Sequence, residues 1–303
     1  MNEIEKFQAY LLSRDKSQKT IQGYAMDLRQ FQTWLGMDRS LASMLTEDVR
    51  KYRDHMMAMG ASPNTISRRL AALASFGQWG TDQAHLFSEN PALHVEPVQV
   101  TVLAPRWLDK SQKRKLLSAI DEDLRTAREK YPRLWLLRLR DAVMVNFLLG
   151  TGLRVGELCG LMVSDLTIGE RKGSVLVRNG KGRKQRLVPL SNEMRKWMGE
   201  WLKVRPEAAS DRVFIGQRGE PVPPRIVQRV VSRYAEQAGL EDVTPHTLRH
   251  TFAKSVLDSG ANPFEVAKLL GHSSLDSTAR YTQPSEDDLT NAVEMLGKGS
   301  SAT

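Results

Sequence analysis

A proline-rich stretch without helical periodicity divides this chain of 303 residues into two unequal parts. Residues 91–106, PALHVEPVQVTVLAPR, contain three prolines, and their apolar residues do not follow the spacing of a helix face. Proline has no backbone N–H and disfavours a helical residue before it, so such a run is typical of a connection between domains. We therefore predict a domain over residues 1–92, a linker over 93–106 and a second domain over 107–303.

The part before the linker carries apolar residues at the spacing of helix faces, which predicts an all-helical domain. Ser17 is an expected N-cap, and Pro63 follows a second candidate cap, where proline suits the first helical turn. The four expected helices run from Glu3 to Arg14, from Ser17 to Gly36, from Thr46 to about Gly60 and from Ser62 through Phe76.

The part after the linker combines helices with a short β-hairpin. A long apolar helix is centred on residues 141–149, and further helices continue to about Leu296. Between them, Val175–Arg178 and Arg186–Leu190 flank the polar turn NGKGRK, which is a hairpin signal. The predicted fold is mainly α, with an all-helical N-terminal domain and a mostly α second domain that contains a small antiparallel β-sheet.

The charge of the chain is concentrated in its second part. Lys and Arg number 44 against 35 Asp and Glu, which gives a formal net charge of +9. Residues 1–97 hold 11 basic and 11 acidic residues, so the whole excess lies in residues 98–303. A basic domain of this size suits a polyanion, and nucleic acid before a membrane surface. A basic protein without such a partner is the alternative.

Several classes of protein are excluded by what the sequence lacks. No run of apolar residues is long enough for a transmembrane helix, and the N-terminus does not follow the plan of a signal peptide. The single cysteine, Cys159, excludes a disulfide scaffold and any metal site built from several cysteines. We expect a cytoplasmic protein without membrane contact.

Two segments of the second part combine cationic or imidazole side chains with the start of a helix. In GTGLRVGELCGL, Arg154 and Glu157 are three residues apart and are expected to share a helix face. Such a pair in isolation is most often a surface ion pair. In VTPHTLRHTFA, Thr244 is the expected N-cap of a helix whose first turns carry His246 and Arg249. Free backbone N–H groups at a helix start favour an anion.

A third segment, PFEVAKLLGHSSLDSTARYTQ, follows at the end of a helix. The helix is expected to end at Gly271, with His272 directly after it and Tyr281 nine residues later. A tyrosine in isolation is most often a half-buried packing residue. His246 and His250 have the spacing of zinc ligands, but no Glu follows His246, so the protease pattern is absent and we expect no metal site.

Together these side chains form a set that suits phosphoryl transfer. Two arginines, two histidines, a lysine in the hairpin turn and a tyrosine are available. Guanidinium groups bind phosphate oxygens in a bidentate manner and stay charged at any working pH. The lysine after Gly180 is Lys181, although Arg183 and Lys184 share the same turn.

The motifs resemble those of the tyrosine recombinase (phage integrase) family. The strings TGLRVGEL, NGKGRKQRLVPL, HTLRH and LGHSS followed by RYT carry the resemblance, which covers most of residues 107–290. The N-terminal SPNTISRRLAALASF is similar, more loosely, to the core-binding domain of the family. The chain looks like a two-domain recombinase of the Xer and Cre plan, or one encoded by a transposon.

This resemblance implies a role for each matching residue. The implied catalytic set is Arg154, Lys181, His246, Arg249, His272 and Tyr281. Glu157 and His250 would support the site. The expected contacts to DNA outside the catalytic set are Lys19, Arg68, Arg69, Arg183 and Lys184.

The chemistry implied by the resemblance is DNA strand exchange without ATP, metal or other cofactor. Tyr281 would attack a phosphodiester to form a 3′-phosphotyrosyl link, and Lys181 would protonate the leaving 5′ oxygen. The partners would be a double-stranded DNA recombination site, a homo-tetramer on two such sites, and accessory DNA-binding proteins in some settings.

Other functions and settings stay open at this point. A type IB topoisomerase uses a similar set of residues to relax DNA, and a non-catalytic DNA-binding regulator would keep only the fold. The separate helical N-terminal domain and the C-terminal helix favour the recombinase over the topoisomerase, and the six occupied catalytic positions disfavour the regulator. Chromosome-dimer resolution, phage integration and transposition remain possible settings, and the ending RYTQPSEDDL favours a mobile element.

Overall fold

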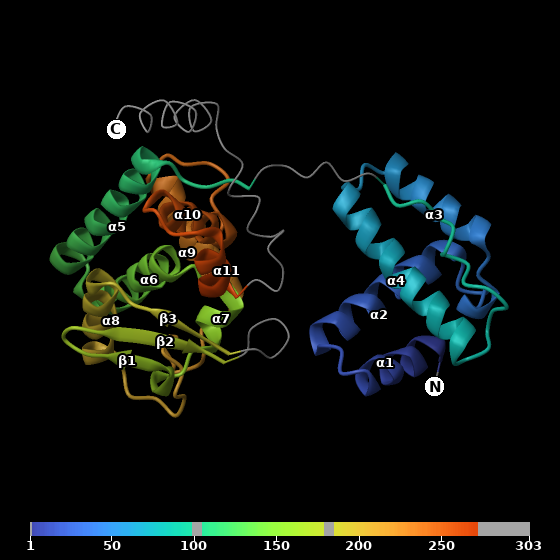
Figure 1. Cartoon of the computed structure of the whole chain (residues 1–303), viewed down its shortest axis with the longest axis horizontal. Helices are drawn as coiled ribbons and strands as arrows, with labels where there is room; N and C mark the ends of the chain where they lie inside the picture. Colours follow the sequence, from blue (N-terminus) through green and yellow to red (C-terminus); the bar gives the residue numbers. More distant parts are fainter. Residues whose placement is uncertain (1, 99–104, 179–184, 272–303) are drawn as a thin grey trace, which may run out of the picture. The chain divides into compact units, whose positions relative to one another are not determined.

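The computed structural model of the chain describes residues 2–98, 105–178 and 185–271. The chain divides into two compact units, Met1–Leu103 and Ala104–Thr303, each with its own hydrophobic core (Figure 1). Within the described residues, no helix is both long and apolar enough to cross a membrane.

The first unit is all-helical, as predicted. Its helices are α1 (Glu3–Ser13), α2 (Gln18–Leu35), α3 (Thr46–Ala58) and α4 (Pro63–Asp82), with a 3₁₀ turn at Leu41–Ser43. Helix α2 contacts α1, α3 and α4, and Phe7, Phe31 and Phe76 are fully buried between the helices. The predicted caps are confirmed, because Ser17 and Ser62 each accept a hydrogen bond from a backbone N–H in the first turn.

The start of the predicted linker belongs to the core of the first unit. Val95 is buried there, 8% exposed, and Arg53 donates a hydrogen bond to the carbonyl oxygen of Glu96. The segment is not helical, as its prolines predict. A non-helical backbone that passes close to the core can still bury an apolar side chain such as Val95. Val95 and Glu96, which fall within the expected linker 93–106, therefore contact the first unit.

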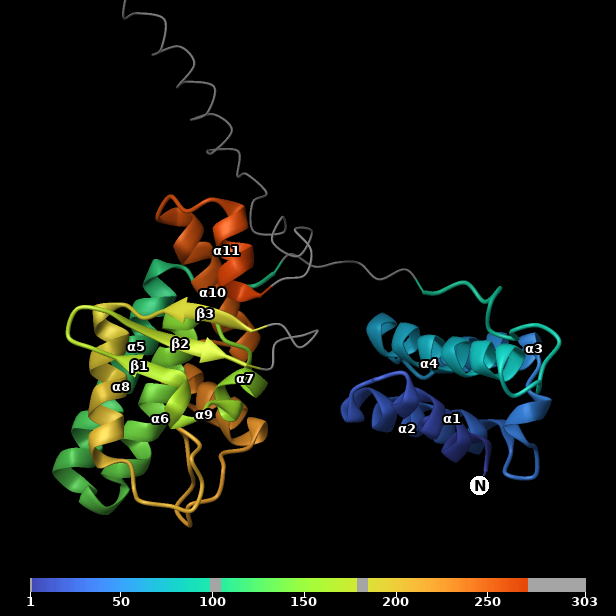
Figure 2. The same cartoon turned by 60° about the horizontal axis from the view of Figure 1, so that its bottom comes forward.

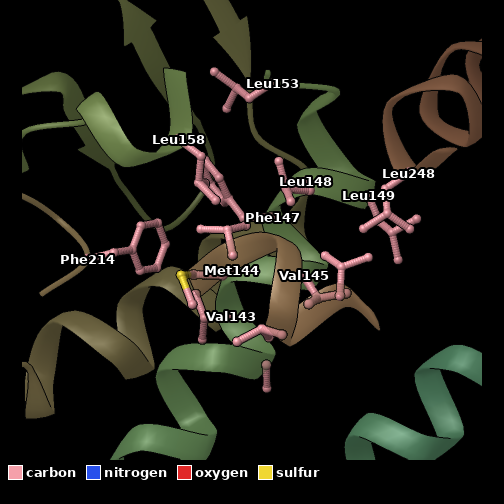
Figure 3. Packing of buried hydrophobic residues seen from close by; sticks show 14 of the residues in the cluster. Val143, Met144, Val145, Phe147, Leu148, Leu149, Leu153, Leu158, Phe214 and Leu248 are labelled. Atoms are coloured by element: carbon pink, nitrogen blue, oxygen red, sulfur yellow. The ribbon is translucent and has the colours of Figure 1, made fainter. Parts of the chain in front are cut away.

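The second unit is built around one central helix. Helix α6 (Pro132–Thr151) contacts five of the others, and almost every residue between positions 139 and 151 is buried. The surrounding helices are α5 (Lys110–Lys130), α7 (Val155–Gly160), α8 (Asn192–Val204), α9 (Pro224–Gln237), α10 (Pro245–Asp258) and α11 (Pro263–Leu270). Figure 3 shows Phe147 of α6 among other apolar side chains of this core. The apolar helix predicted over residues 141–149 is confirmed.

A small antiparallel sheet covers one side of this unit. Its strands β1 (Leu166–Ile168), β2 (Gly173–Val177) and β3 (Arg186–Pro189) lie in the order β1-β2-β3. The predicted hairpin is confirmed by the pairing of β2 with β3, although its turn, residues 179–184, lies outside the described residues. Strand β1 was not predicted, since three residues are too few to show an alternating pattern. The helix expected after Gly271 also lies outside the described part.

A buried ionic cluster holds α6 against its neighbours. Asp141 of α6 binds Arg140 beside it and accepts a hydrogen bond from Arg233 Nη2 of α9 at 3.1 Å. Tyr234 of α9 donates to Asp123 of α5 at 2.9 Å, and burial raises the pKa of that tyrosine. Buried charges are tolerated only when they are paired, so this cluster fixes how the three helices pack.

Replacement of Phe147 tests the importance of the α6 core. Phe147→Ala should lower the free energy of unfolding of the second unit by about 3–5 kcal/mol, because a fully buried aromatic ring leaves a cavity. Urea unfolding followed by circular dichroism measures the change. Phe264→Ala is the matched control, since that ring is 67% exposed and its loss should shift stability by less than about 0.5 kcal/mol. Equal losses in the two variants would contradict this core assignment.

Candidate active site

The site begins where helix α6 ends. Gly152 caps α6 in the left-handed conformation, with φ of 64°, and its N–H donates to the Leu148 carbonyl at 3.0 Å. A Cβ atom at this position would collide with the side chains of Phe252 and Leu270. Glycine is therefore required both by the backbone and by the space, and the chain turns sharply here towards Arg154.

Glu157 binds Arg154 at the start of α7. The two were expected to share a helix face, but Arg154 is the N-cap and lies just outside the helix. Its backbone N–H donates to Glu157 Oε2 at 2.8 Å, and its side-chain Nη1 donates to Oε1 at 2.9 Å. One carboxylate thus holds both the backbone and the guanidinium of Arg154.

The Glu157 carboxylate is buried, in contrast to an ordinary surface ion pair. Its side chain is 6% exposed and receives two N–H groups of Arg186, at 3.0 and 2.7 Å. Burial by itself would raise the pKa of Glu157, but the hydrogen bonds and positive charges of Arg186 and Arg154 outweigh it, so the pKa lies below its ordinary value. The carboxylate is therefore ionised at neutral pH.

Arg186 is a site residue that the sequence reasoning did not identify. It is the first residue of β3, and its side chain is 9% exposed. The signal was present, because Arg186 stands inside the hairpin string NGKGRKQRLVPL next to the turn. Its partners, however, are 29 and 83 positions away along the chain.

Arg249 joins two helix ends. It lies in the second turn of α10, which Thr244 caps as predicted, and it is 4% exposed. Its Nη1 donates to the Gly152 carbonyl at 2.6 Å and its Nη2 to the Leu270 carbonyl at 2.8 Å. A guanidinium suits these carbonyl oxygens because helix C-termini present unpaired acceptors and a negative dipole end.

His246 lies on the first turn of the same helix and is exposed to solvent, with His250 half-buried one turn later. Partial desolvation lowers the pKa of His246, and the positive charges of Arg249 and Arg154 lower it further. The imidazole is therefore neutral at pH 7. His246 thus lies close enough to Arg154 and Arg249 for the charges of both to act on it.

Five of the expected site residues lie outside the described part of the chain. They are Lys181, Arg183, Lys184, His272 and Tyr281. The segments next to them are described: strands β2 and β3 flank the hairpin turn, and α11 ends at Gly271 in the left-handed conformation, with φ of 65°. Figure 2 shows α11 beside β3, in agreement with the contacts between them.

The basic residues expected in the first unit have different surroundings. Lys19 is exposed in the first turn of α2. Arg68 of α4 pairs with Asp27, a carboxylate that is only 1% exposed. Arg69 is half-buried and donates to Tyr52 Oη at 3.3 Å, so it takes part in the packing of α4 against α3. The three do not form one cluster of similar surface cations.

The donor set of the described residues fits a phosphate group better than a metal ion. Over residues 2–98, 105–178 and 185–271, no group of three or more His, Cys, Asp or Glu side chains is arranged to bind a metal. The cationic pair Arg154 and Arg249 offers N–H donors, which suit anionic oxygens.

Comparison with known sequences matches both units of the chain. Residues 106–287 match the phage integrase family, and residues 4–84 match the phage integrase N-terminal SAM-like domain. A tyrosine recombinase XerC of Corynebacterium glutamicum is 33% identical over 279 residues, which is 91% of this chain and 85% of that protein. One of Thermodesulfovibrio yellowstonii is 32% identical over 301 residues, 95% of this chain and 92% of the relative.

Solved structures with the same fold were also found. The XerH site-specific recombinase bound to its palindromic difH substrate, a post-cleavage complex, has a TM-score of 0.75 at 23% identity, covering 94% of this chain and 82% of that one. The Tn1549 transposon integrase in complex with a circular intermediate DNA has a TM-score of 0.71 at 23% identity, covering 98% and 99%.

The buried Glu157 predicts a pH-dependent loss of stability on mutation. At pH 7, Glu157→Gln should lower the free energy of unfolding by about 3–5 kcal/mol, because buried Arg186 loses its counter-charge. Since folding depresses the pKa of Glu157, this contribution is complete above the ordinary value of about 4.3 and is lost as the pH falls through the folded value. Urea unfolding at a series of pH values measures it.

The control for this prediction is another glutamate–arginine pair at the same sequence spacing. Glu122 and Arg125 are both exposed on α5, so Glu122→Gln should leave the unfolding midpoint unchanged at every pH. A Glu157→Gln deficit that stays constant from pH 7 to pH 3 would show that the charge of Glu157 is not its source.

Proposed function

The chain belongs to the phage integrase family, and we propose that it is a site-specific tyrosine recombinase that cuts and rejoins DNA strands through Tyr281. The observation that supports this most is the grouping of Arg154, His246 and Arg249: the charges of both arginines act on His246, and Arg249 donates to the Gly152 carbonyl at the end of α6. Two fixed guanidinium groups beside a neutral imidazole suit a phosphodiester under nucleophilic attack.

The proposed reaction is a transesterification that conserves the energy of the phosphodiester. The oxygen of Tyr281 bonds to the phosphorus while the bond to the 5′ oxygen breaks, and Lys181 gives that oxygen a proton. The product is a 3′-phosphotyrosyl link and a free 5′ hydroxyl. Attack by the 5′ hydroxyl of a partner strand reverses these steps and joins the new strand.

The other side chains have matching roles in this proposal. Arg154, Arg249 and His272 bind the non-bridging oxygens and stabilise the added negative charge. An unperturbed tyrosine has a pKa of about 10, so it needs a base, and neutral His246 accepts its proton. Glu157 positions Arg154 and, like His250, supports the site rather than contacting the reacting atoms.

The two units divide the work of DNA binding in this proposal. The second unit, with Arg183 and Lys184 beside Lys181, binds the cleavage site, and the first is the core DNA-binding domain, with Lys19 and Arg68 as contacts. Arg69 is expected to act first in packing. Four copies assemble on two sites in the cytoplasm, with accessory DNA-binding proteins in some settings, for integration, excision or resolution of a mobile element.

A trapped covalent intermediate tests the proposed reaction. The protein is incubated in EDTA with a nicked suicide duplex carrying repeats that flank its gene, and the products are separated on a denaturing gel. The wild type should form a covalent protein–DNA adduct, and Tyr281→Phe should form none, because the nucleophilic oxygen is missing.

Other outcomes of this experiment would point to other functions. Tight binding to the duplex without an adduct would indicate a DNA-binding regulator. An adduct accompanied by relaxation of a one-site plasmid, with no joint product from two sites, would indicate a topoisomerase.

The salt dependence of DNA binding tests the proposed contact of the first unit. Lys19→Ala should weaken binding and lower the slope of log affinity against log salt by about one, as expected for a lost phosphate contact. Arg68→Ala is less suitable, because it also leaves buried Asp27 unpaired. Lys51→Ala is the control, since Lys51 is an exposed helix residue that pairs with Glu47 at 3.7 Å. An unchanged slope for Lys19→Ala would remove this contact from the proposal.

A further inference from the structure

Three segments of the second unit meet at the guanidinium group of Arg186. The side chain begins on β3, donates through Nη1 and Nη2 to Glu157 of α7, and donates through Nε to the Leu269 carbonyl of α11 at 2.8 Å. Strand, capping turn and helix end are thus joined by one buried side chain.

The geometry of these contacts requires arginine rather than any cation. A guanidinium is planar and carries donors on two edges, so one edge binds the carboxylate of Glu157 as a fork while Nε reaches the carbonyl oxygen. The ammonium group of a lysine is a single point charge and cannot hold both partners in these directions.

The end of α11 lies directly against the same side chain. A Cβ atom on Gly271 would lie 2.9 Å from Arg186 Nη1 and 3.0 Å from its Cδ. The left-handed cap at Gly271 therefore lets the chain leave α11 in contact with Arg186. The next residue in the sequence is His272, and Lys181 precedes Arg186 by only five positions.

We propose that Arg186 is a positioning residue that sets the hairpin bearing Lys181 in register with the Arg154 turn and the end of α11. This inference rests on the proposed recombinase function. When Arg186 is replaced, the Leu270 carbonyl of α11 still accepts a hydrogen bond from Arg249, and Glu157 still accepts one from Arg154. The strand β3 is the segment that loses its ionic link to Glu157 when Arg186 is replaced.

The step that depends on Arg186 is therefore protonation of the leaving 5′ oxygen. A hairpin that shifts by about 1 Å misplaces its lysine, and a misplacement of that size lowers a rate about 100-fold. DNA binding should change little, because Arg186 is buried and donates its hydrogen bonds to Glu157 and Leu269. A leaving group that needs no proton should therefore restore the rate of cleavage.

A duplex with sulfur in place of the bridging 5′ oxygen provides that condition. A thiol has a pKa near 8.5, so a thiolate leaves without protonation, whereas an alkoxide does not. Adduct formation is measured for the wild type, Arg186→Lys and Lys181→Ala on the oxygen and the sulfur duplex, together with the Kd for each. Lys181→Ala gives the behaviour expected when the proton donor is absent.

We expect the rate of adduct formation to fall strongly on the oxygen duplex and only slightly on the sulfur duplex. Arg186→Lys should form adduct about 100-fold more slowly than the wild type on the oxygen duplex and within about 5-fold of it on the sulfur duplex, with Kd within about 3-fold. Should Arg186→Lys fail to fold, Arg186→Gln, which leaves Glu157 paired with Arg154, should show the same sulfur rescue.

Arg178→Lys is the matched control. Arg178 follows β2 at the same base of the hairpin, and its ion pair is made through Nε with the buried Asp165 instead of with Glu157. Its variant should cleave both duplexes at nearly the wild-type rate. A similar sulfur-rescued loss in this control would overturn the specific role of Arg186.

The remaining outcomes are also distinct. Wild-type cleavage by Arg186→Lys on the oxygen duplex, or an equal loss on both duplexes, would overturn the positioning role. Absence of an adduct with the wild type on both duplexes would instead overturn the proposed function itself.

Discussion

The second unit depends on one buried carboxylate and the two arginines that bind it. Transferring the charged carboxylate of Glu157 from water into the protein is costly. The cost is offset only if its oxygens accept hydrogen bonds from charged donors. The backbone and side chain of Arg154 and the fork of Arg186 do this together. Because no single partner is sufficient, α7 and β3 are fixed relative to each other as soon as this group is buried.

Helix ends provide the second constraint on the site. Helices α6 and α11 both end in a left-handed glycine, and arginine side chains bind carbonyl oxygens at these ends. The carbonyls at a helix C-terminus lack helical partners, so they accept hydrogen bonds from guanidinium groups and orient them. These bonds hold the guanidinium group of Arg249 in a fixed position between the two helix ends. The neutral state of His246 follows from the same positive surroundings.

Local signals in the sequence predicted most of the elements, and the failures have physical causes. The caps Ser17, Ser62 and Thr244 were predicted because an N-cap and its first turn are neighbours along the chain. Strand β1 was missed because three residues show no period. The burial of Val95 was missed because its partners in the core are distant in sequence, so the composition of its own segment does not reveal them.

The sequence alone determined the type of fold and the residue types available to the proposed site. The order of the motifs, the periodicity of the helices and the presence of arginine, histidine, lysine and tyrosine at fixed spacings are local properties that a sequence displays directly. Tertiary structure decided how those residues are held. It placed Arg154 at an N-cap, buried Glu157, and made Arg186 the common partner of segments 29 and 83 positions away. Periodicity reports which face of an element is buried, but the partner of a long-range hydrogen bond depends on how the elements pack.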